Sequence, residues 1–183
     1  MLFRSETALG DLIADILRDS FGIDLMLMGS GAIRSYSLGP VVHYADLVEC
    51  LPYDDAVYML KVTGTQLERM IRHILRDEAF QGEHTEFYQF SHGMRIVWSR
   101  SGQVFRELTL DGEVLHADRL YSVAMQKYHY NNLKPFLNIT LEEAEQNGKI
   151  RVLSTSARDV VEEYLTVNQH LSREVEGRLV VEA

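Results

Sequence analysis

The stretch Ile23-Asp24-Leu25-Met26-Leu27-Met28-Gly29-Ser30-Gly31-Ala32-Ile33-Arg34 decides how the N-terminal part of the chain folds. Its first half is short and almost entirely apolar, which is typical of a strand buried on both faces. The glycines that follow predict a tight loop, because Gly adopts backbone conformations that are closed to other residues. We therefore expect a buried strand over 23–28 that leads into a loop ending at Arg34.

Helices are predicted on both sides of this strand. Before it, apolar residues recur at the spacing of an amphipathic helix: Leu9, Leu12, Ile13, Ile16 and Leu17. After it, residues 57–62 are expected to form a strand. Thr65, followed three residues later by Glu68, then predicts a capping box at the start of a helix that runs to Leu75.

The second half of the chain is predicted to be mainly β-structure at first and then mixed. Apolar alternation over 94–98, 104–110 and 121–125, with a turn at Asp111-Gly112, favours an antiparallel meander. Cap signatures follow at Thr140 with Glu143 and at Ser156 with Asp159, and a last strand is expected over 178–181. No repeat or flexible linker interrupts this order. The sequence predicts a single α+β domain with a mixed or antiparallel sheet and packed helices.

Composition narrows the possible partners. The 183 residues include 18 Lys and Arg against 27 Asp and Glu, a formal charge of −9, which argues against a nucleic acid polymer or an anionic membrane. Neither a signal peptide nor an apolar run long enough for a membrane span is found. We expect a cytoplasmic location if Met1 is the natural start, and export if the chain was cut from a secreted parent.

Candidates for catalysis are lacking. The histidines do not stand at a zinc-binding spacing, and no Gly-x-Ser-x-Gly motif occurs. Cys50 is interpreted as a buried, unreactive thiol. Glu83, His84 and Glu86 lie in a polar stretch and are interpreted as solvated surface rather than ligands. We therefore assign no catalytic residue and no metal ligand.

Candidates for binding are clearer. The loop Gly29-Ser30-Gly31 beside Arg34 could hold a phosphate through backbone N–H groups and a guanidinium, although a plain turn explains the glycines equally. Tyr53 follows a stiffening proline, and Tyr128 is expected in a polar loop after a strand. These two rings could stack on a flat ligand or could simply cover the core.

Several motifs in order resemble one family, the C-terminal domain of the 5′-nucleotidases, which include bacterial UDP-sugar hydrolases and the ecto-5′-nucleotidase. Residues 6–15 resemble its Glu-x-x-Leu-Gly-Asn-Leu-Ile opening, 29–34 its Asn-Gly-Gly-Gly-Ile-Arg, and 51–55 its Leu-Pro-Phe-Gly-Asn. Further matches are the helix start at 62–67, the Phe-Leu-Gln-Val-like stretch at 87–91, the Tyr-x-Val stretch at 121–128, and Glu176-Gly177-Arg178.

The resemblance implies roles for individual residues. Arg34 matches an arginine that binds the substrate phosphate, and Gly31 lies in the same loop. Tyr53 and Tyr128 match two aromatics that hold the nucleobase between them. Arg4 lies one residue from the position of a second phosphate-binding arginine.

Two departures from the family pattern concern the ligand. Gly29 stands where the family has asparagine, so one side-chain hydrogen bond is absent. Residues 132–135 replace a Gly-Gly-Asp-Gly loop that supplies a ribose-binding aspartate, and Asn131 or Asn132 is a candidate substitute.

The resemblance also implies that a second domain, which these residues do not include, carries out catalysis. In the family, a separate N-terminal metallophosphoesterase domain holds two divalent metal ions and hydrolyses the substrate, and its Gly-Asn-His-Glu-type segment does not occur here. Residues 1–183 are therefore expected to be a nucleotide-recognition domain without its own cofactor and inactive alone. The alternatives are a stand-alone, non-catalytic nucleotide-binding or interaction module, and a generic α+β domain with purely structural tyrosines.

Overall fold

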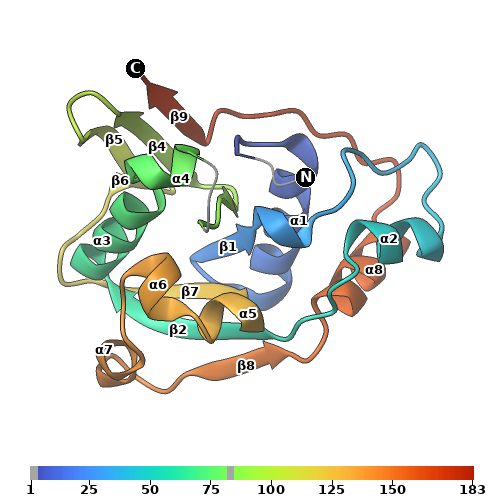
Figure 1. Cartoon of the computed structure of the whole chain (residues 1–183). Coiled ribbons are helices and arrows are strands. Elements are labelled where there is room, and N and C mark those ends of the chain that lie inside the picture. The colour runs from blue at the N-terminus through green and yellow to red at the C-terminus, as the bar shows by residue number, and fades with distance from the viewer. Residues whose placement is uncertain (1–3, 82–84) are drawn as a thin grey trace.

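Two β-sheets form the framework of the protein (Figure 1). The computed structural model describes residues 4–81 and 85–183, so Glu83 and His84 lie outside the described residues. The first sheet has the order β3-β1-β7-β2-β8, with β1 Leu25–Gly29, β2 Val57–Thr63, β3 Tyr88–Phe90, β7 Leu120–Gln126 and β8 Arg151–Ser154. The second has the order β6-β5-β4-β9, with β4 Met94–Ser99, β5 Val104–Leu110, β6 Glu113–Val114 and β9 Leu179–Glu182.

Strand β1 is buried on both faces, as the sequence predicts. Leu25 and Leu27 face one hydrophobic cluster, and Met26 and Met28 face the other. This two-sided burial explains why the strand is nearly all apolar rather than alternating. It also fixes the point at which the glycine loop leaves the sheet.

The helices cover the two faces of the first sheet. On one side, α1 Ala8–Phe21, α2 Tyr44–Cys50 and α8 Ala157–Val167 enclose the cluster around Met26 and Met28. On the other side, α3 Gly64–Ile74 and α6 Leu133–Leu137 pack with the second sheet. Three shorter helices complete the fold: α4 Asp77–Gln81, α5 Lys127–Tyr130 and α7 Leu141–Gln146. The α+β prediction is confirmed.

The predicted meander is correct only for its first part. Strands β4, β5 and β6 pair antiparallel in succession, but β7 leaves this sheet. It lies instead between β1, to which it is parallel, and β2, to which it is antiparallel. Residues Val123 to Gln126 are buried throughout, as expected for a central strand, and local alternation carries no information on which sheet such a strand joins.

The cap of α3 also differs from the prediction. The helix begins at Gly64, and Thr63 Oγ1 accepts from Gln66 N while Gln66 Oε1 accepts from Thr63 N. The predicted Thr65–Glu68 box is wrong by two residues, because the Thr65 hydroxyl donates to the Ala117 carbonyl instead. The predicted caps at Thr140 and Ser156 are confirmed.

Charged residues inside the fold join the first helix to the last strand. Arg178 donates to both Asp15 oxygens, at 2.6 and 2.8 Å, and to Glu176. Glu6 accepts from the backbone N–H groups of Glu176, Gly177 and Leu179. Asp11 completes this group, with its Oδ2 at 3.8 Å from Arg178 Nε. We call Asp11, Asp15 and Arg178 the buried ionic cluster; Glu6 is half-buried and Glu176 is exposed at its edge.

Among the described residues, every helix is too short or too polar to cross a lipid bilayer.

Candidate nucleotide-binding site

Arg34 lies just beyond the glycine loop, which forms the short 3₁₀ helix η1 Ser30–Ala32. Its backbone N–H donates to the Cys50 carbonyl at 2.8 Å, so the end of α2 fixes its position. The guanidinium is exposed and donates through Nη2 to the Tyr53 hydroxyl at 3.2 Å. Its Cζ also lies 5.3 Å from the centroid of the Tyr53 ring. Arg34 and Tyr53 therefore form a pair at the surface.

Tyr53 stands on a loop that is fixed from below. The neighbouring Asp54 accepts from the Ser156 hydroxyl at 2.6 Å and from Arg158, and the Asp55 carbonyl accepts from Ala157 N at 3.0 Å. The start of α8 thus anchors the loop while the Tyr53 side chain remains 56% exposed. The Tyr53 ring, directly after Pro52, is thus accessible at the surface.

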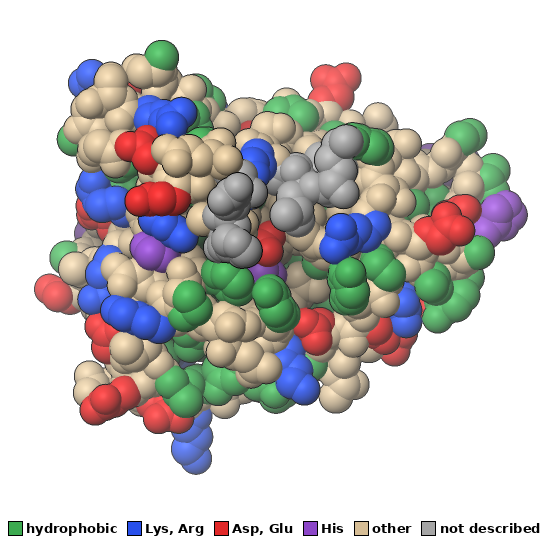
Figure 2. Space-filling view, viewed as in Figure 1, with side chains coloured by type: hydrophobic (Ala, Val, Ile, Leu, Met, Phe, Trp, Pro, Cys, Tyr) green, Lys and Arg blue, Asp and Glu red, His purple; other side chains and the backbone are tan. Residues whose placement is uncertain are grey.

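Tyr128 lies on α5 rather than in a loop as predicted. Its N–H donates to Asp55 Oδ2 at 3.1 Å, and Lys127 N donates to the Ala56 carbonyl, so α5 begins against the Tyr53 loop. The Tyr128 ring is 54% exposed. The fold therefore places the first turn of α5, which carries Tyr128, against the loop of Tyr53, and Tyr53 contacts Arg34. Figure 2 shows hydrophobic side chains gathered over α5 and α6 and again over α2 on this face.

His129 lies beneath Tyr128 and was not expected from the sequence. It is 2% exposed, its Nδ1 is 2.9 Å from the Tyr88 hydroxyl, and burial lowers its pKa to about 4. A Cβ atom placed on Gly29 would lie 2.0 Å from its Nε2. His129 in this position therefore requires a glycine at position 29. A single sequence does not reveal such a pair, because the two residues meet only in the folded sheet.

Glu86 is not the solvated carboxylate that we expected. It is half-buried, and its Oε1 accepts from the Gly31 backbone N–H at 3.0 Å. Burial raises its pKa, opposed by hydrogen bonds from Gly31 and Phe87 and by the charges of Arg4 and Arg34. The glycine loop thus already holds an anionic group from its own chain.

Two of the three remaining predicted residues, Arg4 and Asn132, have hydrogen-bond partners within the chain. Arg4 donates to the Ala79 carbonyl within α4 and to Thr85 Oγ1, which fixes its position against this part of the chain. Asn132 Nδ2 donates to the Tyr128 carbonyl at 2.7 Å and so stabilises the end of α5. Asn131 is exposed at the end of the same helix. Of these three, only Asn131 has its side chain free of a hydrogen bond within the described residues.

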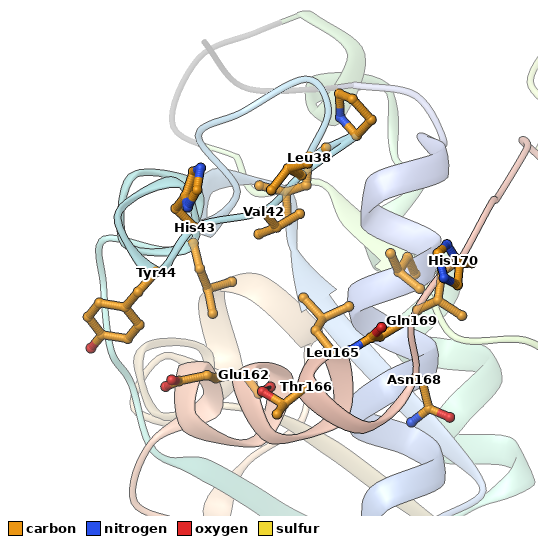
Figure 3. Close-up of a pocket in the computed structure, with 16 residues that line it drawn as sticks. Leu38, Val42, His43, Tyr44, Glu162, Leu165, Thr166, Asn168, Gln169 and His170 are labelled. Carbon is orange, nitrogen blue, oxygen red and sulfur yellow. Dashed lines mark hydrogen bonds between the residues drawn. The ribbon is translucent and has the colours of Figure 1, made fainter.

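A separate cavity of about 540 Å³ lies between the 38–44 loop, α1 and α8 (Figure 3). Leu12, Leu47 and Leu165 give it apolar walls, and Glu162, Thr166 and Gln169 stand along α8 and just beyond it. Tyr44 points away from this cavity in the close-up. None of the residues predicted to bind a ligand lines it.

Metal ligands are not assembled within the described ranges, where no group of three His, Cys, Asp or Glu side chains could hold an ion. Cys50 is completely buried, and burial raises the pKa of its thiol, as expected for an unreactive cysteine. The described residues therefore do not fit a dimetal centre, and we derive no chemical step through one.

Comparison with known proteins identifies the family. The sequence profile described as "5′-nucleotidase, C-terminal domain" matches residues 2–138, well over half of the chain. The chain belongs to the 5′-nucleotidase C-terminal domain family. The comparison with curated protein sequences finds no match.

Solved structures share the fold of this 5′-nucleotidase C-terminal domain. A 5′-nucleotidase precursor from Thermus thermophilus gives a TM-score of 0.80 at 22% identity, covering 98% of this chain and 36% of that one. The NAD nucleotidase of Haemophilus influenzae gives 0.76 at 15% identity, covering 96% and 33%. A sulfate thiohydrolase, SoxB, also from Thermus thermophilus, gives 0.67 at 17% identity, covering 98% and 33%. The chain thus spans about a third of the length of these proteins.

Proposed function

We propose that this domain recognises a nucleotide or nucleoside for a metal-dependent 5′-nucleotidase-like phosphoester hydrolase. In this proposal the base is held between Tyr53 and Tyr128, and the phosphate is bound by Arg34. Catalysis belongs to a metallophosphoesterase domain that the described residues do not contain.

The observation that carries the proposal is the junction between the loop of Tyr53, which Arg34 contacts, and the first turn of α5, which carries Tyr128. Asp55 joins the loop of Tyr53 to the first turn of α5 through its bond to Tyr128 N, and Arg34 bonds to the Tyr53 hydroxyl. Two exposed aromatic rings offer faces for stacking, and a guanidinium offers paired donors to a phosphoryl group. Because aromatic rings stack on any nucleobase, this site would bind nucleotides as a class and discriminate little between different bases.

The ribose has one unengaged candidate partner. The Asn132 amide is committed to the Tyr128 carbonyl, whereas the Asn131 side chain has no hydrogen-bond partner within the described residues. We expect Asn131 rather than Asn132 to contribute to ribose binding. An Asn131→Ala variant should weaken adenosine binding more than an Asn132→Ala variant that remains folded.

The test is calorimetric titration of the chain with adenosine, AMP and UMP. Tyr53→Ala and Tyr128→Ala should each weaken binding of all three ligands, by about tenfold for each stacking ring removed. Tyr44→Ala is the matched control, because Tyr44 is as exposed as Tyr53, at 56%, and belongs to α2 beside the separate cavity. Equal affinity in all the variants would contradict the stacking site.

A stand-alone binding module is distinguished by the sequence that precedes this domain in its gene. The hydrolase proposal expects a metallophosphoesterase domain encoded in the same reading frame or supplied by a partner, and phosphate release from AMP only in its presence. Nucleotide binding by a protein whose gene encodes no such domain, and for which no partner supplies one, would favour the module instead.

A further inference from the structure

The glycine loop proposed to receive a phosphate already binds a carboxylate. Glu86 Oε1 accepts from the Gly31 N–H at 3.0 Å, two residues before β3 begins at Tyr88. This strand pairs antiparallel with β1, with Tyr88 opposite Gly29, so the sheet itself holds Glu86 against the loop. The contact is therefore built into the strand register rather than made by a freely moving side chain.

The charge of Glu86 acts on the same groups that a phosphate would use. The carboxylate is half-buried, and the charges of Arg4 and Arg34 both act on it. Arg4 is held by Ala79 and Thr85, whereas Arg34 contacts Tyr53. An incoming anion at Arg34 would thus meet a fixed negative charge in a partly desolvated setting, where charge–charge interactions are stronger than in water.

Building on the proposed function, we propose that Glu86 determines specificity at this site by charge: it occupies the Gly31 N–H and repels a ligand phosphate that would use it. Ligands with a phosphomonoester dianion bear the full repulsion. Neutral nucleosides and ligands whose phosphate carries a single charge, as in a diester, bear less. The Glu86 side chain must move aside or take up a proton before a dianion can use the Gly31 N–H.

The test compares Glu86→Gln with the unchanged chain, using adenosine and AMP as calorimetric probes. Glutamine retains an oxygen that can accept from Gly31 but carries no charge. We expect Glu86→Gln to tighten AMP binding about fivefold to tenfold and to leave adenosine binding within about twofold, as for the loss of one partly exposed neighbouring charge. The ratio of the two affinities is the measured quantity.

Glu49→Gln serves as the matched control, because Glu49 is an exposed glutamate on α2 and its removal changes the net charge equally. Thermal unfolding of each variant reports whether the fold is intact. If AMP tightens equally in both variants, the effect comes from net charge and the proposal is wrong. If Glu86→Gln weakens AMP binding, Glu86 shapes the loop for phosphate and the proposal is equally wrong.

Failure of this inference can be separated from failure of the proposed function. Adenosine binding that depends on Tyr53, together with AMP affinity unchanged by Glu86→Gln, would overturn only the role of Glu86. If neither ligand binds the unchanged chain or Glu86→Gln, both proposals fall. If AMP binds only to Glu86→Gln, the charge competition is supported in its strongest form.

Discussion

Two arginines of this domain, Arg178 and Arg34, differ in what their guanidinium groups contact. Arg178 is 3% exposed, and its Nε and both terminal nitrogens donate to Asp15, Glu176 and the Phe90 carbonyl. Arg34 is exposed, and within the described part of the chain its guanidinium makes one hydrogen bond, to Tyr53. One guanidinium has its donors engaged and stabilises the fold, while the other retains donors that a ligand can use.

The hydrogen-bond partners of an arginine side chain, rather than the sequence motif around it, indicate whether it stabilises the fold or is available to a ligand. Both residues lie in stretches that resemble the same family, so the sequence places them on equal footing. The buried ionic cluster should therefore respond to substitution through stability, and the exposed site through binding.

The largest effect is expected for Arg178→Met. Removing the cation leaves Asp15, which is 5% exposed, without its main partner and next to Asp11. Breaking one side of a buried pair costs about 3–5 kcal/mol of unfolding free energy. Urea unfolding followed by circular dichroism measures it.

Arg178→Lys keeps the charge but loses the two-pronged contact with Asp15, so it should lie between Arg178→Met and the unchanged chain. This second variant keeps the prediction testable if Arg178→Met does not fold. A loss below about 1 kcal/mol for both, within the range of an exposed ion pair, would show that the cluster is not structural.

A second large effect is expected in the pH dependence of the unfolding free energy, through Asp11. This side chain is fully buried, neither oxygen has a hydrogen-bond partner among the described residues, and burial raises its pKa to about 8, with Arg178 opposing. The folded state thus holds a proton that the unfolded state releases near 3.8. Stability from this proton is complete below that value and declines as pH rises to about 8, by at most about 1.4 kcal/mol per pH unit.

Asp11→Asn isolates this contribution, because asparagine is neutral at every pH. The difference in unfolding free energy between Asp11→Asn and the unchanged chain should move steadily in favour of the variant from pH 5 to pH 8. Titrating groups that do not interact with Asp11, including His129, are common to both proteins and cancel. A difference that does not change with pH would show that Asp11 is ionised in the folded protein.

An intermediate effect is expected for Gly29→Ala. Gly29 has φ −62° and ψ 123°, which any residue can adopt, so the cost is steric and arises at His129 Nε2. Overpacking of this kind costs about 1–3 kcal/mol. In a His129→Ala background the same change should cost less than about 1 kcal/mol, because the colliding ring is gone. Equal costs in both backgrounds, measured by urea unfolding, would show that the two residues are independent.

Local sequence patterns predicted most helices and strands correctly. They failed where the same residues allow two structures, such as two alternative helix caps or membership of either sheet. The chain contains both Thr63-x-x-Gln66 and Thr65-x-x-Glu68. In the fold Thr63 forms the cap with Gln66, while the Thr65 hydroxyl donates to the distant Ala117 carbonyl. Strand β7 has the composition of a strand in either sheet, and its parallel partner β1 lies far away in sequence.

The residues of the candidate site likewise fall into those that local sequence patterns predict and those that they do not. Arg34, Tyr53 and Tyr128 could be selected because each stands in a short recognisable motif, although their ligand stays a prediction. Glu86 and His129 could not, because each matters through a glycine that becomes its neighbour only when β1 pairs with β3 and β7. Contacts across a sheet have no local signature in a single sequence.

The smallest effect on stability is expected for Arg34→Met. Arg34→Met removes an exposed guanidinium whose side-chain hydrogen bond is to Tyr53, so the free energy of unfolding should change by less than about 0.5 kcal/mol. Binding of AMP should nevertheless weaken by about tenfold or more, the loss of one charge-assisted hydrogen bond, while adenosine is affected much less. Urea unfolding and calorimetry on the same preparation give both numbers. A marked loss of stability would mean that Arg34 stabilises the fold as Arg178 does, and the contrast between the two arginines would then be wrong.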